Sequence, residues 1–182
     1  LYLVDVSSMF FRAYYAIRSL TSPAGLPVNA IYGFLSMIAK LIKEEKPELL
    51  VFCYDRKEPS FRKDLYEDYK AHRTEMPEDL AVQIPYIKKF ADLLGIPSLE
   101  VPSFAADDLI GGLTELGLRS NCQVVIVSGD KDFAQLVTDK IKIYKPGLKG
   151  GDVEILGVEE VKAKYEIEDP KQVIDFLAMM GD

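Results

Sequence analysis

The residues with the clearest capacity for chemistry are six aspartates, each of which follows a short apolar run. They are Asp5, Asp55, Asp107, Asp108, Asp130 and Asp132. In open parallel sheets ligands bind at the carboxyl ends of the strands, so side chains that are remote in sequence converge at that edge. Carboxylates crowded together repel one another unless cations lie among them. The pattern therefore predicts a site in which these aspartates hold divalent cations.

The ligand types narrow both the metal and the reaction. Oxygen ligands without a His or Cys cluster favour Mg²⁺, with Mn²⁺ as a substitute, over zinc. Two such ions roughly 4 Å apart orient a water for in-line attack on phosphorus and stabilise the leaving oxygen. We therefore expect phosphodiester hydrolysis without a covalent enzyme intermediate. Taken singly, each aspartate also has a structural explanation, because Asp ends strands in turns and Asp107 could cap a helix.

Positive charge is concentrated in residues 56–73, where it is interleaved with aromatic residues. The basic members are Arg56, Lys57, Arg62, Lys63, Lys70, His72 and Arg73, and the aromatic members are Phe61, Tyr66 and Tyr69. Basic groups neutralise backbone phosphates and aromatic rings stack on unpaired bases, so we expect this segment to grip a nucleic-acid strand. A solvated helix with i,i+4 ion pairs is the alternative, because acidic residues are mixed in.

Two further residues, His72 and Arg12, could act at the predicted site only if they lie near the strand ends. His72 is the sole histidine and lies away from them, which disfavours a role as metal ligand or general base. Arg12 follows the first apolar run by a few residues, so it could reach a scissile phosphate. An arginine on the surface or in an ion pair is the other interpretation of Arg12.

Strand-like and helical segments alternate along the chain and would position these residues. Buried strands are expected at residues 1–4, 49–54, 99–101 and 123–127, with a hairpin at 141–144 and 153–156. Helices are expected at 29–44, 77–95, 107–118, 158–165 and 170–180. This alternation predicts a doubly wound α/β fold, in which helices flank a mostly parallel sheet.

Length, composition and net charge limit the possible fold and function. With 182 residues, of which 48% are hydrophobic, the chain is long enough for one globular domain. A net charge of −7 argues against nucleic-acid binding unless the acid excess lies where metals neutralise it. No membrane span or export signal is apparent, and we expect Cys53 and Cys122 to be small core residues.

Short motifs occur in one order from end to end. They are Leu3-Val4-Asp5, Phe11-Arg12-Ala13-Tyr14, Tyr54-Asp55 with Pro59-Ser60-Phe61-Arg62, Tyr69-Lys70-Ala71-His72-Arg73, Met76-Pro77-Glu78, Ala106-Asp107-Asp108, Ser128-Gly129-Asp130-Lys131-Asp132 with Gln135-Leu136, and Met180-Gly181-Asp182. In this order and spacing the chain resembles the 5′ nuclease domain of bacterial DNA polymerase I and its stand-alone 5′-3′ exonuclease and flap endonuclease relatives.

The resemblance implies a PIN-like fold with a helical arch at about residues 56–80. It also implies Mg²⁺-dependent removal of nucleotides and flaps from DNA 5′ ends in replication and repair, with some action on RNA in RNA–DNA hybrids. The resemblance further implies a polymerase domain in the same or a separate chain. It also implies a location in the bacterial cytoplasm at the nucleoid, and no membrane partner.

The resemblance also assigns roles to individual residues. The metal ligands, direct or through water, are Asp5, Asp55, Asp107, Asp108, Asp130, Asp132 and Asp182. Lys70 and Arg73 match basic residues of the arch that place the scissile phosphate, and Arg12 matches a residue near the same phosphate. The nucleic-acid-binding set is Arg62, Tyr69, Lys70, His72, Arg73 and Lys131.

Three departures from the family pattern bear on activity. The family has Glu where this chain has Ala105, so one inner carboxylate is absent, which should loosen a metal and slow cleavage. Val6 replaces the usual Gly after the first aspartate, where a bulkier residue alters the local backbone. The family continues beyond Asp182 to a further aspartate and a helical module that grips duplex DNA. We expect that module to be absent or truncated here and duplex binding to be weaker.

Two competing functions remain open. Ala105 favours a catalytically impaired module that still binds DNA 5′ ends and flaps. A phosphatase would use Asp130 as nucleophile with Asp132 as its partner, but this explains neither the basic segment nor the other acids. Substitution of Lys70 and Arg73 would distinguish these possibilities. A nuclease or a DNA-binding module should lose binding to 5′ ends, whereas a small-molecule phosphatase should not.

Overall fold

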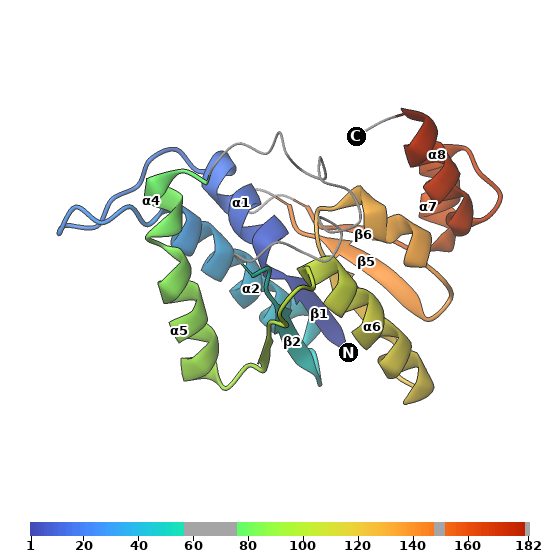
Figure 1. The fold of residues 1–182 in the computed structure, drawn as a ribbon, viewed down its shortest axis with the longest axis horizontal. Helices are drawn as coiled ribbons and strands as arrows, with labels where there is room; N and C mark the ends of the chain where they lie inside the picture. The colour runs from blue at the N-terminus through green and yellow to red at the C-terminus, as the bar shows by residue number, and fades with distance from the viewer. Residues whose placement is uncertain (57–75, 148–151, 181–182) are drawn as a thin grey trace.

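The computed structural model describes residues 1–56, 76–147 and 152–180, which form a six-stranded sheet with helices on both faces (Figure 1). The strands are β1 (Tyr2–Asp5), β2 (Leu50–Cys53), β3 (Ser98–Leu99), β4 (Val124–Val127), β5 (Ile141–Lys145) and β6 (Glu154–Leu156). Their order is β3-β2-β1-β4-β5-β6, and only β6 is antiparallel to its neighbour. The predicted mostly parallel sheet and its closing hairpin are therefore confirmed.

The strand order reverses at the centre of the sheet, between β1 and β4. From β1 the chain moves outward through β2 to β3, and it then returns to the other side of β1 and moves outward through β5 to β6. Helices leave the two central strands in opposite directions at such a switch point, which opens a crevice at the carboxyl ends of the strands. Asp5 ends β1 at this point, and Ser128 follows β4.

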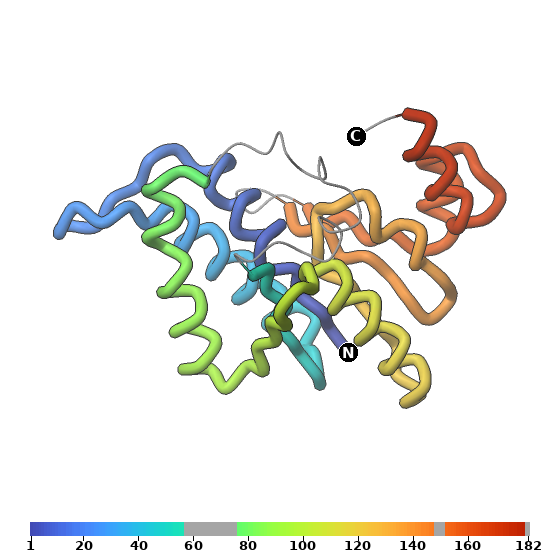
Figure 2. The backbone as a smooth tube through the Cα atoms, in the orientation of Figure 1, coloured from blue at the N-terminus to red at the C-terminus, as the bar shows by residue number. Residues whose placement is uncertain are grey.

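Two buried clusters show how the helices divide between the two faces. The first face carries α1 (Val6–Ala16), α2 (Asn29–Glu45), α4 (Glu78–Ala81) and α5 (Ile84–Leu94). The second carries α6 (Ala106–Arg119), the 3-10 helix η1 (Lys131–Leu136), α7 (Val158–Tyr165), the 3-10 helix η2 (Pro170–Gln172) and α8 (Val173–Met180). Because successive strand residues point to opposite faces, Val4 packs in the first cluster and Leu3 in the second. Figure 2 shows α5 and α8 toward opposite ends of the molecule.

The helix expected across residues 77–95 is wrong as one element. It is divided into α4 and α5, with Val82 and Gln83 between them. Pro85 has no N–H, and its ring clashes with the carbonyl of the residue four positions earlier, so one continuous helix is disfavoured. The fully buried side chain of Gln83 instead accepts the N–H groups of Ala30 and Ile31 at 3.0 and 3.1 Å. Through these hydrogen bonds, Gln83 joins the α4–α5 junction to the start of α2.

Smaller departures affect other elements. The strand expected at 99–101 is only two residues long and starts one residue earlier, and the helix expected at 170–180 begins as η2 before it becomes α8. Neither α1 nor η1 is expected from the pattern. Cys53 is buried as expected, whereas Cys122 is only partly buried. Within the described ranges, no helix has both the length and the apolar character needed to cross a bilayer.

The close approach of α1 and α2 depends on Gly33. A Cβ at this position would lie 2.8 Å from the Cβ of Ala13 and 3.3 Å from its Cα. We predict that Gly33→Ala lowers the free energy of unfolding by about 1 to 3 kcal/mol, because the added methyl group overpacks the contact. Urea denaturation would measure the change.

Gly112 provides the control, because a Cβ there meets nothing within 4 Å and the residue lies exposed in α6. Gly112→Ala should raise stability by about 0.5 to 1 kcal/mol through helix propensity. Equal effects of the two substitutions would contradict the packing explanation.

Candidate functional site

Asp5 occupies the carboxyl end of β1 and is also the N-cap residue of α1. One carboxylate oxygen accepts the backbone N–H of Ser8 at 3.0 Å, and the other accepts the hydroxyl of Ser128 at 2.9 Å. Only 7% of the residue is exposed. The pKa of Asp5 is raised to about 6, mainly by burial and also by the charges of Asp55 and Asp130, while the two hydrogen bonds oppose the rise. Asp5 is thus a desolvated carboxylate beside two others.

The turn after β4 is held against α1 by side chains of both segments. The hydroxyl oxygen of Ser128 accepts the backbone N–H of Asp130 at 3.0 Å while its proton goes to Asp5. The backbone N–H of Gly129 donates to the hydroxyl of Ser8 at 3.2 Å. Asp130 in turn caps η1 by accepting the N–H of Asp132 at 3.0 Å. These bonds fix the two sides of the switch point to each other.

The acids that come after β2 and β3 gather at the start of α6. Asp55 accepts the N–H of Ala106, the first residue of α6, at 2.8 Å. Asp108 accepts the N–H of Ala105 at 3.1 Å, and Asp107 accepts the N–H of Asp108 at 2.8 Å. Unpaired N–H groups and the helix dipole favour negative charge at a helix start. Asp107 is one candidate for capping this helix. Asp108 and Asp55 instead accept the first N–H groups of α6, and Asp107 accepts only the N–H of Asp108.

The structure thus brings Asp5, Asp55, Asp107, Asp108 and Asp130 to one edge of the sheet but does not gather them around a single point. Among the described residues, no three acidic, histidine or cysteine side chains are close enough together to hold a metal ion. The carboxylates of Asp5, Asp55, Asp107, Asp108 and Asp130 instead each accept a backbone N–H, which leaves lone pairs for a further ligand. A buried carboxylate within electrostatic reach of two others, with oxygen ligands throughout, suits a hard divalent cation. The residue types therefore fit Mg²⁺, although the ligand geometry stays a prediction.

Arg12 lies on α1 beside the turn after β4. A Cβ placed on Gly129 would lie 3.5 Å from one terminal nitrogen of the Arg12 guanidinium. The Arg12 Nε is buried, and it has no hydrogen-bond partner in the described part of the chain. A buried donor without a partner costs about 1 to 3 kcal/mol, so an arriving anion would be favoured there.

Other expected residues are less well placed by the structure. Lys131 is the exposed first residue of η1, next to Asp130. Arg62, Tyr69, Lys70, His72 and Arg73 lie within residues 57–75, and Asp182 lies within 181–182, so all six fall outside the described residues. The same holds for most of the arch expected at 56–80. Their roles stay predictions.

Two of the departures from the family pattern can be located. Ala105 is the N-cap residue of α6 and has no side-chain oxygen, so its place beside Asp107 and Asp108 lacks a carboxylate. Val6 is the first residue of α1, is buried in the first core cluster and is not among the residues with positive φ. Val6 therefore adopts an ordinary helical backbone here, and the expected difference from the Gly of the family stays a prediction.

Sequence reasoning missed Ser8 and Ser128 as site residues. Both use a hydroxyl group to join α1 to the turn after β4. Asp5 and Ser8 have the spacing of an N-cap residue and the N3 position, a signal that would also have revealed α1. Burial, with a contribution from the charge of Asp5, raises the pKa of the Cys53 thiol to about 12, so this neighbour of the site stays protonated and is a poor nucleophile.

The chain is similar in sequence to known nucleases and polymerases. Residues 1–166 match the family described as 5′-3′ exonuclease, N-terminal resolvase-like domain. The chain is 41% identical, over its whole length, to a 5′-3′ exonuclease of Aquifex aeolicus and 36% identical to DNA polymerase I of Bacillus subtilis. It spans 61% of the former protein and 21% of the latter.

Solved structures agree on the fold. The T5 D15 protein co-crystallised with metal ions matches all of this chain with a TM-score of 0.76 at 20% identity, over 66% of its own length. Flap endonuclease-1 from Methanococcus jannaschii matches 99% of this chain with a TM-score of 0.56 at 15% identity, over 64% of its length. The architecture is therefore PIN-like, as expected.

The raised pKa of Asp5 predicts how stability depends on pH without a divalent metal. The folded state retains the Asp5 proton up to about pH 6, whereas the unfolded state loses it near 3.8, so the contribution of Asp5 to stability falls as pH rises through this window. The total loss is about 3 kcal/mol. Urea denaturation in EDTA should show that Asp5→Asn gains about this much stability relative to the parent between pH 4 and 7. Parallel pH profiles for the two proteins would contradict the burial of an ionised carboxylate.

Proposed function

Because the chain belongs to the 5′-3′ exonuclease family defined by this N-terminal resolvase-like domain, we propose that it is the catalytic part of a nuclease. It would hydrolyse phosphodiester bonds at DNA 5′ ends and flaps with two Mg²⁺ ions, for which Mn²⁺ could substitute. The observation that carries the proposal is Asp5, a buried carboxylate at the switch point with Asp55 and Asp130 close enough to raise its pKa. Such a group is stabilised in its ionised form by a cation.

The carboxylates would take different roles as metal ligands because they differ in burial. Asp5 is held by Ser8 and Ser128, so it would provide a fixed ligand. Asp55 and Asp130 are less buried than Asp5, so their side chains can turn toward a shared cation. Asp107, Asp108, Asp132 and Asp182 complete the proposed set. When bound, the two ions would lower the pKa of a water and stabilise charge on the phosphate oxygens.

Arg12 would bind the scissile phosphate. Its guanidinium lies beside Gly129, next to Asp130, and its buried Nε has no partner in the described structure. A phosphate oxygen would supply that partner through a charge-assisted hydrogen bond. Lys70 and Arg73 would approach the same phosphate from the arch segment, which rests on the family resemblance alone.

The proposed partners are inferred from the relatives. A T5 D15 flap endonuclease has been solved with DNA and metal ions, which supports DNA with 5′ ends or flaps as the substrate. Several relatives are DNA polymerase I, so a polymerase domain would act in the same or a separate chain. RNA in RNA–DNA hybrids and a place at the bacterial nucleoid remain part of the proposal by resemblance.

Ala105 supports a second candidate, a module that binds 5′ ends but cleaves them poorly. The backbone N–H of Ala105 donates to Asp108, and the position adds no carboxylate to the acids at the start of α6. Fewer carboxylates weaken the hold on a cation, because the ion's charge is less fully balanced.

Cleavage of a 5′-labelled flap duplex would test both candidates. We predict Mg²⁺-dependent cleavage that EDTA abolishes and that Ala105→Glu increases by about 10 to 100-fold. Ala105→Gln is the matched control, since it adds the same volume without the charge, and it should leave the rate near that of the parent. Cleavage that resists EDTA would contradict the nuclease mechanism. Cleavage by the Glu variant alone would identify the parent chain as the binding module.

A separate prediction concerns Arg12. Arg12→Gln should reduce flap cleavage by about 10 to 100-fold, because a charged hydrogen bond is worth about 1.5 to 3 kcal/mol. The free energy of unfolding of this variant should not fall below that of the parent, because the substitution removes a buried donor without a partner. Arg119→Gln, at an exposed position on α6, is the control and should cleave at the parental rate. Equal rates for the parent and Arg12→Gln would remove Arg12 from the site.

A further inference from the structure

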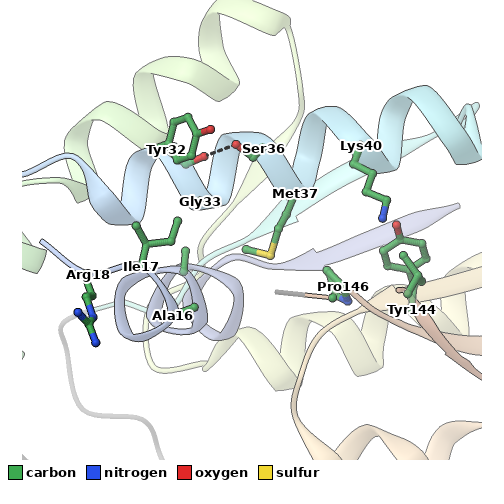
Figure 3. A pocket seen from close by; sticks show the side chains of 13 residues that line it. Ala16, Ile17, Arg18, Tyr32, Gly33, Ser36, Met37, Lys40, Tyr144 and Pro146 are labelled. Atoms are coloured by element: carbon green, nitrogen blue, oxygen red, sulfur yellow. Dashed lines mark hydrogen bonds between the residues drawn. The ribbon is translucent and has the colours of Figure 1, made fainter. Parts of the chain in front are cut away.

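Tyr15 is a large aromatic side chain that the core does not use. It lies on the last turn of α1, and 72% of the residue is exposed. Ala13, two positions earlier, packs against α2 at Gly33, and positions two apart point to nearly opposite sides of a helix with about 3.6 residues per turn. Figure 3 shows Ala16 and Ile17 beside a cavity that α1 and α2 help to line, and Tyr15 is not part of this lining. An exposed tyrosine is common on protein surfaces, so exposure alone assigns no role to the ring.

The place of Tyr15 along α1 sets it beside the residues of the site. Ser8, Arg12 and Tyr15 are separated by four and three residues, so they share one face of the helix. The Ser8 hydroxyl accepts the N–H of Gly129 at 3.2 Å, and the Arg12 guanidinium lies beside the same glycine. Side chains three residues apart on a helix have Cβ atoms about 5 to 6 Å from each other. The Tyr15 ring is therefore the next side chain along this face after the guanidinium that would bind the scissile phosphate.

The ring of Tyr15 is exposed, but its surroundings are fixed. It packs edge to face on the ring of Tyr14, with the ring centroids 5.1 Å apart and the planes at 80°. The Tyr14 hydroxyl donates to the Asp79 carboxylate at 2.7 Å. The side-chain amide of Asn29 donates to the carbonyl oxygens of Tyr14 and Ile17 at 3.1 and 3.2 Å, which holds the end of α1. A ring that is already oriented loses little freedom when a ligand stacks on it.

We propose that Tyr15 stacks on an unpaired base of the strand whose phosphate is bound by Arg12. The inference rests on the proposed function, to which it adds how the chain selects an unpaired strand. An aromatic ring next to a cation suits single-stranded DNA, because each nucleotide has a flat base joined to a phosphate. Bases at a nick are paired and already stack on their neighbours, so the ring would favour a flap over a nick. Because the Tyr15 side chain is neutral, its contribution to binding should depend less on salt than that of Arg12.

The test places 2-aminopurine, a fluorescent analogue of adenine, at successive positions of the flap next to the junction. Its fluorescence reports whether the base is stacked. Ca²⁺ would replace Mg²⁺ to limit cleavage, because its looser coordination disfavours a two-metal reaction. Saturating parent protein should change the fluorescence at one position, Tyr15→Phe should preserve this change, and Tyr15→Leu should remove it. Tyr86→Leu is the matched control, because Tyr86 is exposed on α5, and it should behave as the parent does.

Affinity provides an independent measurement. Tyr15→Leu should weaken binding of the flap duplex by about 5 to 100-fold, which is the range for the loss of one base–aromatic stack. Binding of a nicked duplex of the same sequence, in which no base is unpaired, should change by less than about twofold. Tyr15→Phe should bind both substrates as the parent does. Because the ring is exposed, the thermal unfolding of each variant should match that of the parent.

The outcomes distinguish this inference from the function on which it rests. If the parent binds the flap duplex without a fluorescence change, or if Tyr15→Leu keeps the change, the inference alone is overturned. Equal weakening of the flap and nicked duplexes by Tyr15→Leu would also overturn it, because the ring would then not act on an unpaired base. A parent chain that binds neither duplex would overturn both the inference and the proposed function.

Discussion

The hydrogen bond from the Ser128 hydroxyl to the Asp5 carboxylate is the interaction on which the site depends, because it crosses the switch point of the sheet. Parallel strands bring residues 123 positions apart together at this bond. The same carboxylate starts α1 through Ser8, and the same hydroxyl accepts the N–H of Asp130. One buried acid therefore sets the direction of a helix, the path of a turn and the place where negative charge accumulates.

Burial gives this arrangement its chemical character. Desolvation disfavours ionised Asp5, and the nearby acids Asp55 and Asp130 disfavour it further. The fold maintains this unfavourable charge because the strands on either side are held by extensive apolar packing on both faces of the sheet. Stored electrostatic repulsion of this kind is typical of functional sites, where a ligand of opposite charge relieves it.

The fold class and the edge at which the aspartates lie could be predicted from sequence because both depend on local patterns. Apolar runs indicate buried strands, and parallel strands place the residues after them at one edge. The division of the helix before Pro85 and the roles of Ser8 and Ser128 depend on contacts between distant segments. Hydroxyl groups occur throughout the chain, so only the folded geometry shows which two join α1 to the turn after β4. The positions of ligands around a cation likewise depend on side-chain orientations that spacing does not encode.

If Asp5 forms part of a divalent cation site, the stability of the protein at neutral pH must depend on Mg²⁺. A cation that binds only the folded state raises the free energy of unfolding by about 2.7 kcal/mol at a hundred times its dissociation constant. We predict that the parent chain gains stability in this way as Mg²⁺ is added and that Asp5→Asn loses most of the gain. A stability that is independent of Mg²⁺, or an equal gain in both proteins, would contradict it.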